Sequence, residues 1–267
     1  MNELLAKAEI EPRESWGFKQ LQQRVNDIYT EHDEICGYGP DTMLAKLLGN
    51  SVTLAHVIRK TPDDFNTINR SITNVFIWAA TVANAAGIDL QKVMEKQFGA
   101  GCPHCRQMPC LLTQGKTCEK PTTVDLQSKP YVLSPSSLNK WQEHLKKMYA
   151  NNFQTDNIQT ALSFSSTRLA EEIGELIGSA YADIEKELNS VSFQTDINPF
   201  ESEMADLFAW AFAVANCIEV KNGKYSIGDA LEEKYDKGCP YCKSPQCICP
   251  KVKTLIESLR DKRPSFL

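Results

Sequence analysis

The chain has 267 residues, of which 42% are hydrophobic and 24% charged, and its formal net charge is −5 at pH 7. This composition excludes a disordered protein, and the acidic balance argues against general nucleic-acid binding, which needs a basic face. The sequence contains no apolar run of the ~18 residues that span a bilayer, and it starts without the basic-then-apolar pattern of a secretory signal. We therefore expect a soluble cytoplasmic protein with no membrane partner.

Apolar residues recur at intervals of three and four in six segments, which predicts amphipathic helices. In chain order these segments are 18–29, 43–58, 72–86, 138–149, 161–189 and 204–218. Thr61-Pro62-Asp63-Asp64 and Asn198-Pro199 predict helix starts, in which proline follows an N-cap residue. No segment shows the alternation of a strand, so the predicted fold class is all-α.

The sequence also repeats itself. "FIWAATVAN" (76–84) and "FAWAFAVAN" (208–216) share Phe, Trp, Ala, Val, Ala and Asn at matching places, 132 residues apart. "LAKLLGNSV" matches "LAEEIGELI", and "FKQLQQRVNDIY" matches "LNKWQEHLKKMY". Such a long period indicates a duplicated domain and not a solenoid of short repeats. We predict a first helical unit at 1–118, a linker at 119–134, a second unit at 135–250 and a C-terminal helix or tail at 251–267.

Eight of the ten cysteines lie in two short groups, which would form a knuckle at the end of each unit. They are Cys102, Cys105, Cys110, Cys118, Cys239, Cys242, Cys247 and Cys249. In a chain without an export signal, C-x2-C pairs indicate structural zinc more than disulfides. One zinc ion for each group is the first choice, and one ion shared by Cys102, Cys105, Cys239 and Cys242 is the second. In both arrangements we expect the zinc to lie away from the acidic residues described next.

Five carboxylates stand out in the second unit. Glu171, Glu172 and Glu175 lie within about 100° of one another on a helix, in the otherwise apolar stretch "LAEEIGELIG". On the following helix Glu203 and Asp206 lie about 60° apart. Carboxylates that converge in a bundle core without partners would be very costly, whereas a divalent cation turns their repulsion into ligation. Oxygen ligands of this kind suit Mg²⁺ or Mn²⁺.

A comparison of the two copies separates structural from functional positions. Residues that both copies keep, such as Asn84 and Asn216, are expected to serve the shared fold. The five carboxylates are not kept in the first copy. Their counterparts there are Lys46, Leu47, Asn50, Ser71 and Asn74. This difference is expected if one copy has a metal site and the other has lost it.

The motif E-E-x-x-E followed by E-x-x-D resembles the signature of the MazG-like all-α nucleoside triphosphate pyrophosphohydrolases. In this chain it reads "EEIGE" at 171–175 and "EMAD" at 203–206, and the resemblance covers about 138–236 and, in degenerate form, about 16–98. It implies Mg²⁺-dependent cleavage of a ribo- or deoxyribonucleoside triphosphate between the α and β phosphates, which gives a monophosphate and pyrophosphate. Because such proteins usually pair two chains, it also implies that the two copies form a pseudo-dimer within this chain. Further homo-oligomerisation is left open, and the cysteine knuckles depart from the family pattern.

The same resemblance assigns roles to the five carboxylates. Glu172, Glu175, Glu203 and Asp206 would be the metal ligands. Glu171 would be a further ligand or the group that orients the attacking water.

Five other residues are candidate substrate contacts: Arg168, Trp210, Lys221, Lys224 and Lys234. Arg168 lies one turn before Glu171, where it could bind a phosphate or form an ion pair with the neighbouring glutamates. The lysines could reach phosphates, and Trp210 could stack on a base or pack in the core. The alternative to an enzyme is a non-catalytic nucleotide-binding or adaptor protein that uses its zinc knuckles to contact another macromolecule.

Overall fold

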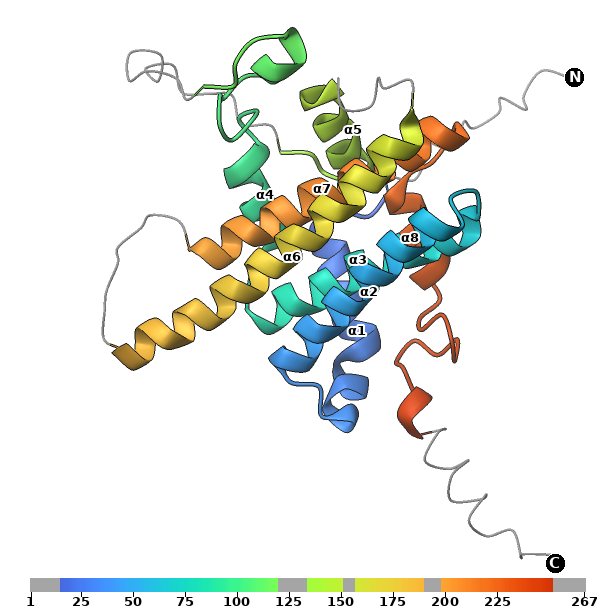
Figure 1. Ribbon diagram of the computed structural model, residues 1–267. Helices are drawn as coiled ribbons and strands as arrows, with labels where there is room; N and C mark the ends of the chain where they lie inside the picture. Colours follow the sequence, from blue (N-terminus) through green and yellow to red (C-terminus); the bar gives the residue numbers. More distant parts are fainter. Residues whose placement is uncertain (1–14, 120–133, 151–156, 190–197, 252–267) are drawn as a thin grey trace, which may run out of the picture.

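The computed structural model describes residues 15–119, 134–150, 157–189 and 198–251 (Figure 1). The predicted linker lies almost entirely outside these ranges, as does the predicted C-terminal helix or tail after residue 251. Within them the chain is helical and has no strand, so the predicted all-α class is confirmed. No single helix of this described part is both long and apolar enough to cross a membrane; α3 and α4 meet both requirements only together, as a pair bent by 104°.

Eight α-helices are described, four before the predicted linker and four after it. The first four are α1 (Phe18–Cys36), α2 (Pro40–Lys60), α3 (Phe65–Ala85) and α4 (Leu90–Phe98). The last four are α5 (Leu138–Met148), α6 (Ile158–Asn189), α7 (Pro199–Asn222) and α8 (Ile227–Tyr235). A short 3₁₀-helix, η1 (Leu111–Gln114), lies between the two sets. All six predicted helices are present, and α4 and α8 are the short helices that precede the cysteine groups.

One of the two predicted helix starts is confirmed and the other is wrong in detail. Asn198 caps α7, where its side chain accepts a hydrogen bond from the N–H of Phe200, and proline follows it as predicted. In α3 the cap is Asp64, whose carboxylate accepts from the N–H of Thr67 at 3.1 Å. The helix therefore begins at Phe65, after Pro62, because an aspartate in this position satisfies an otherwise unpaired helix donor.

The helices of the two halves pack in matching pairs. Within each half α2 packs against α3 and α6 against α7, while α1 packs on α3 and α5 on α7. Between the halves α2 contacts α6 and α3 contacts α7. The last helix of each half also crosses over, because α4 packs against α7 and α8 packs against α3. Neither half of the sequence is therefore a closed structural unit.

Aromatic side chains from both halves meet in one core. Phe18 packs on Phe208 with ring centroids 5.1 Å apart, and Phe76 packs on Phe212 at 5.2 Å. Phe76 also contacts Phe208, its counterpart in the repeated segment, at 5.4 Å. All four rings are fully buried. The Phe that both copies keep thus serves the shared fold, as predicted from the repeat.

Candidate active site

Three of the predicted acidic residues lie together between α6 and α7. One carboxylate oxygen of each of Glu172, Glu175 and Glu203 lies within 4.8 Å of the others. Asp206 is one turn beyond Glu203 on α7, and its charge acts on Glu172. The two acidic helix faces therefore meet where α6 packs along α7. Carboxylate oxygens grouped in this way could hold a metal ion.

The carboxylates share a strongly perturbed environment. Burial, followed by the charges of Asp206 and Glu175, raises the pKa of Glu172 to about 7, against which Arg168 acts only in part. Burial also raises the pKa of Asp206 to about 6. The pKa of Glu203 is raised by burial and by Glu175 and Asp206. Desolvation and like charges both disfavour ionisation, so without a cation the ionised group costs stability.

Replacing Glu172 by Gln should consequently stabilise the magnesium-free protein at pH 8. Because the pKa of Glu172 is raised in the folded state, folding carries a penalty that is complete above pH 7 and fades as the pH falls toward the ordinary glutamate value of about 4.3. We expect a gain of at least about 1 kcal/mol, or about 2 to 4 °C in Tm, at pH 8 and a smaller gain at pH 6. Thermal unfolding followed by circular dichroism at both pH values measures it. A loss of Tm that is equal at the two pH values would contradict the assignment.

Glu171 is not part of the group of three carboxylates. Its side chain is 47% exposed and pairs with Arg168, which also bonds Glu172 at 3.1 Å. The guanidinium of Arg168 lies 5.4 Å from the ring centroid of Trp210. The ion pair foreseen for Arg168 is therefore present, and the arginine lies between the carboxylates and Trp210. Holding Arg168 in this place is a better-supported role for Glu171 than binding metal.

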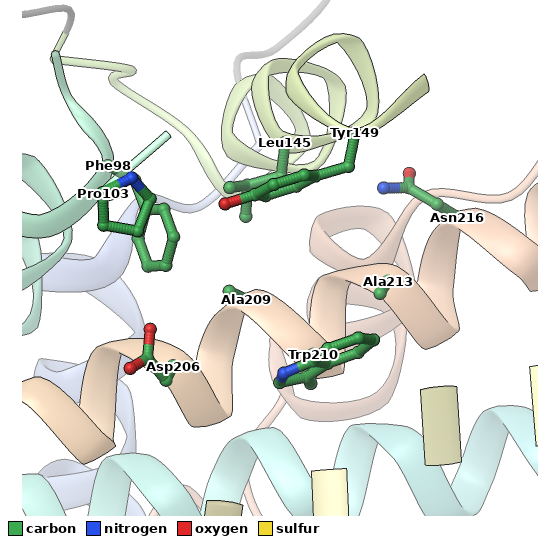
Figure 2. Close-up of a pocket in the computed structure, with 9 residues that line it drawn as sticks. All are labelled: Phe98, Pro103, Leu145, Tyr149, Asp206, Ala209, Trp210, Ala213 and Asn216. Carbon is green, nitrogen blue, oxygen red and sulfur yellow. The ribbon is translucent and has the colours of Figure 1, made fainter. Parts of the chain in front are cut away.

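A cavity of ≈ 170 Å³ is lined by Asp206 and otherwise mainly by apolar side chains. Figure 2 shows Trp210 and Asp206 on α7 along one side, and Tyr149, just after α5, on the opposite side. Phe98 and Pro103, both from the first half of the chain, lie near Asp206 (Figure 2). A flat aromatic group could enter between Trp210 and Tyr149 while its charged end reaches the carboxylates. Trp210 thus lines the cavity, and it also packs on Phe164 at 5.7 Å.

Asn216 at the far end of the cavity is a candidate that sequence reasoning assigned to the shared fold (Figure 2). The side chain is fully buried, its Nδ2 donates to the carbonyl of Gln142 at 3.3 Å, and its Oδ1 has no hydrogen-bond partner among the described residues. Its counterpart Asn84 is saturated: Oδ1 accepts from Gln22 at 2.8 Å, and Nδ2 donates to the Gln22 carbonyl and to Asn26. The structural role predicted for both residues therefore fits Asn84. For Asn216 the Oδ1 acceptor is left without a partner among the described residues.

A different choice of partner by one glutamine explains this contrast. Gln22 and its counterpart Gln142 occupy matching places on α1 and α5. Both glutamines donate from Nε2 to a matching backbone carbonyl, Gln22 to that of Ile88 at 2.7 Å and Gln142 to that of Tyr225 at 3.2 Å. Gln22 Nε2 also donates to Asn84 Oδ1, whereas Gln142 Nε2 also donates to Glu219 at 3.4 Å. Glu219 thus takes the donor that satisfies Asn84 in the first half.

The three predicted lysine contacts lie elsewhere. Lys221 Nζ bonds the Pro62 carbonyl and Asp63, and it stands 15 residues after Asp206, about 22 Å along the same helix. Lys234 Nζ donates to Asn74 Oδ1 and to Thr73, both at 2.8 Å, on α3 of the first half. Lys224 is exposed in the loop after α7. The structure does not bring these lysines to the carboxylates.

The eight grouped cysteines form two separate clusters of four, each with its sulfur atoms within 4.8 Å of one another. No described cysteine is in a disulfide. Each cluster could hold a metal such as zinc, and this grouping favours one ion per cluster over one ion shared between them. Although burial acts to raise them, hydrogen bonds from backbone N–H groups lower the pKa values of Cys105 and Cys242 to about 7. Ligands that deprotonate this readily suit zinc binding.

The knuckle that holds the first cluster borders the cavity. Pro103, between Cys102 and Cys105, lines the same cavity as Asp206. The sequence does not reveal this, because periodicity does not show that α4 packs on the other half of the chain. Comparisons with protein-family models, with curated proteins and with solved structures gave no match to this chain.

Proposed function

We propose that the protein is a Mg²⁺-dependent pyrophosphohydrolase that cleaves nucleoside triphosphates between the α and β phosphates, with its active site in the second half. The observation that carries this proposal is the juxtaposition of the carboxylate group with an aromatic cavity that also holds an unpaired buried acceptor. The end of the cavity at Asp206 suits a metal-bound polyphosphate, and the end at Asn216 suits a base.

The residues present fit a magnesium ion. Glu172, Glu175 and Glu203 would hold it, with Asp206 one turn away, and all four offer the hard oxygen ligands that Mg²⁺ prefers. When bound, the ion would neutralise phosphate charge and align the phosphates for attack by water.

The remaining side chains would bind and orient the nucleotide. Arg168 is held by Glu171 and Glu172 beside the ring of Trp210, where its guanidinium could contact a phosphate oxygen. Trp210 and Tyr149 offer apolar faces on the two sides of a base. Asn216 Oδ1 would accept a hydrogen bond from a base N–H or from a sugar hydroxyl.

The position in the first half that matches Asp206 is Asn74, and a different side chain contacts it. Gln97 Nε2 lies 3.5 Å from Asp206 in the second half, and its counterpart Lys234 bonds Asn74, the counterpart of Asp206. An ammonium group thus stands on the side of α3 where the acids are missing. This supports a single active site per chain, with the first half as its structural complement and the two halves as a pseudo-dimer.

The test is a panel of ribo- and deoxyribonucleoside triphosphates incubated with the full-length protein and Mg²⁺ and assayed for pyrophosphate. Release of monophosphate and pyrophosphate in equal amounts, abolished by omission of the divalent ion, is the expected result. Binding of a nucleotide without pyrophosphate release would favour the non-catalytic adaptor. Release of inorganic phosphate alone would contradict cleavage between the α and β phosphates.

The two asparagines provide a matched pair of variants. Asn216→Ala should raise the KM for the preferred nucleotide by about 10-fold, because it removes one hydrogen bond to the ligand. Asn84→Ala should leave the KM unchanged and lower the unfolding free energy by about 1 kcal/mol, because it removes the hydrogen bonds that Asn84 makes with Gln22 and Asn26. Steady-state kinetics and thermal unfolding of both variants measure the contrast. Equal KM values for the two variants would remove Asn216 from the binding site.

A further inference from the structure

We propose that the first cysteine cluster (Cys102, Cys105, Cys110 and Cys118) binds a zinc ion that fixes one wall of the cavity beside the carboxylates, so that ligand binding in the second half depends on this zinc. The equivalent cluster (Cys239, Cys242, Cys247 and Cys249) would bind a second zinc ion that supports only the first half. The part that concerns nucleotide binding rests on the proposed function; the part that concerns zinc and its effect across the chain does not.

The geometry of the first cluster fits a closed tetrahedral site. The sulfur atoms of Cys105 and Cys110 are 3.8 Å apart, and those of Cys110 and Cys118 are 3.6 Å apart. Cys102 and Cys118 are 3.8 Å apart. Zinc–sulfur bonds of about 2.3 Å in a tetrahedron place the sulfurs about 3.8 Å from one another. Four thiolates fill the coordination sphere, so this ion would shape the site and leave no position for a reacting water.

The knuckle is attached to the second half by several contacts. The N–H of Cys110 donates to the carbonyl of Met148, the last residue of α5, at 2.9 Å. The hydroxyl of Tyr149 hydrogen-bonds Cys102. Pro103 and Tyr149 both line the cavity. Cys102, a ligand of this zinc, directly precedes Pro103 in the chain and contacts Tyr149.

Helix α4 adds two contacts on the same side. The carbonyl of Phe98, the last residue of α4 and a further wall residue, lies 3.0 Å from the Nε2 of His144 on α5. Gln97 reaches Ser202 and Asp206 on α7. The knuckle and α4 thus connect the first half of the sequence to the acidic face of the second.

The second cluster repeats this attachment in the opposite direction. The N–H of Cys247 donates to the carbonyl of Ile28 on α1 at 2.7 Å, and Tyr29 hydrogen-bonds Cys239. Arg24 donates to the carbonyl of Tyr235, the last residue of α8, at 3.0 Å. Each cluster therefore braces the other half of the chain, and the first places Pro103 in the cavity that Asp206 also lines. The two clusters match in local structure and differ in their surroundings, so each is a control for the other.

The backbone around Pro103 explains why ligation matters for this wall. Gly101 has φ +106°, and a Cβ there would lie 3.0 Å from the backbone oxygen of Gln107. Arg106 has φ 57°, a left-handed conformation that is unfavourable for a side-chain-bearing residue. The conformation of Arg106 needs the surrounding structure to hold it. Zinc ligation is coupled to local folding, so loss of the ion should release the turn and Pro103 with it.

The experiment compares Cys105→Ser with Cys242→Ser in the full-length protein. Elemental analysis should find two zinc ions per wild-type chain and one in each variant. Hydrogen–deuterium exchange, recorded without nucleotide, should then rise in residues 203–213 of α7 for Cys105→Ser. For Cys242→Ser it should rise in the matching residues 71–81 of α3.

Binding of an α,β-methylene nucleoside triphosphate with Mg²⁺ provides the second readout. We expect Cys105→Ser to weaken it by about 10-fold or more, as for other residues that position a site indirectly. Cys242→Ser should change it by less than about 3-fold, the usual effect of a remote substitution. Pro103→Ala and Pro240→Ala keep all the cysteines and cover the case in which a serine variant does not fold. Pro103→Ala should weaken binding with both zinc ions retained, and Pro240→Ala should not.

Three results would overturn the inference. They are wild-type protein purified without zinc, exchange that rises in the same segment for both serine variants, and equal effects of Pro103→Ala and Pro240→Ala on binding. If the wild-type protein binds no nucleotide analogue, the proposed function fails, while zinc content and exchange still decide whether the first zinc braces the second half.

Discussion

Glu175→Gln and Asp206→Asn should each lower the rate of pyrophosphate release by about 100-fold or more, the loss seen when one electrostatic contact to a transition state is removed. Glu175 lies within 4.8 Å of both Glu172 and Glu203, so its removal would take one charged ligand from the centre of the group. Asp206 borders both this group and the cavity. Both substitutions keep the size of the side chain and remove only its charge.

The duplication supplies the control for this result. Asn50→Ala changes the counterpart of Glu175 in the first half, where the Nδ2 of Asn50 bonds the carbonyl of Lys46 on its own helix. Activity should remain close to that of the wild type. Asn74→Ala should also cost far less activity than Asp206→Asn. It is a less simple control, because it removes an acceptor of Lys234, whose pKa burial lowers to about 8.

Steady-state assays of pyrophosphate release, with circular dichroism to establish that each variant is helical, distinguish the two halves. Wild-type rates in both Glu175→Gln and Asp206→Asn would mean that the carboxylates do not carry the reaction. A loss as large in Asn50→Ala as in Glu175→Gln would mean that the first half has an active role beyond packing.

The sequence predicted what depends on local pattern. Helical periodicity gave the six long segments, the cysteine spacing gave two possible metal clusters, and Glu172, Glu175 and Glu203 were predicted to converge. These features follow from residue types at fixed separations, and neighbouring residues on a helix face stay neighbours in the fold.

Features that depend on contacts between distant segments were not predictable in the same way. Periodicity does not show whether α4 packs on its own half of the chain or on the other half. Because α4 packs on α7, Pro103 lines the same cavity as Asp206. The different roles of Asn84 and Asn216 depend on the second partner of the matching glutamine, which is Asn84 for Gln22 and Glu219 for Gln142. Identical residues in matching positions therefore have different surroundings, which no pattern within either copy discloses.

The second half of the chain, produced alone as residues 135–267, should neither fold stably nor hydrolyse nucleotides. Phe208 and Phe212 would lose Phe18 and Phe76, with which their rings pack at 5.1 to 6.1 Å in the shared core. Residues on α7 that are fully buried in the full chain would be exposed to water. Apolar patches of that kind lead to association or aggregation.

The isolated half would also lack part of the active site. Gln97, Phe98 and Pro103 all belong to the first half, and the first contacts Asp206 while the other two line the cavity. Even a half that folded by pairing with a second copy of itself would place Lys234 where Gln97 stands, because Lys234 is the matching residue of the second copy. An ammonium group next to Asp206 would compete with a divalent cation for that carboxylate. Such a self-paired half should therefore bind magnesium more weakly than the full chain does.

Co-expression of residues 1–134 with residues 135–267 separates these effects. We expect the two fragments to co-purify as a 1:1 complex that is helical and active, since the described contacts between the halves do not require the linker to be intact. Size-exclusion chromatography, circular dichroism and the pyrophosphate assay would compare the complex with each fragment alone. If residues 135–267 alone were monomeric, stable and as active as the full chain, the first half would be dispensable, and the proposed pairing of one active and one degenerate copy would have to be abandoned.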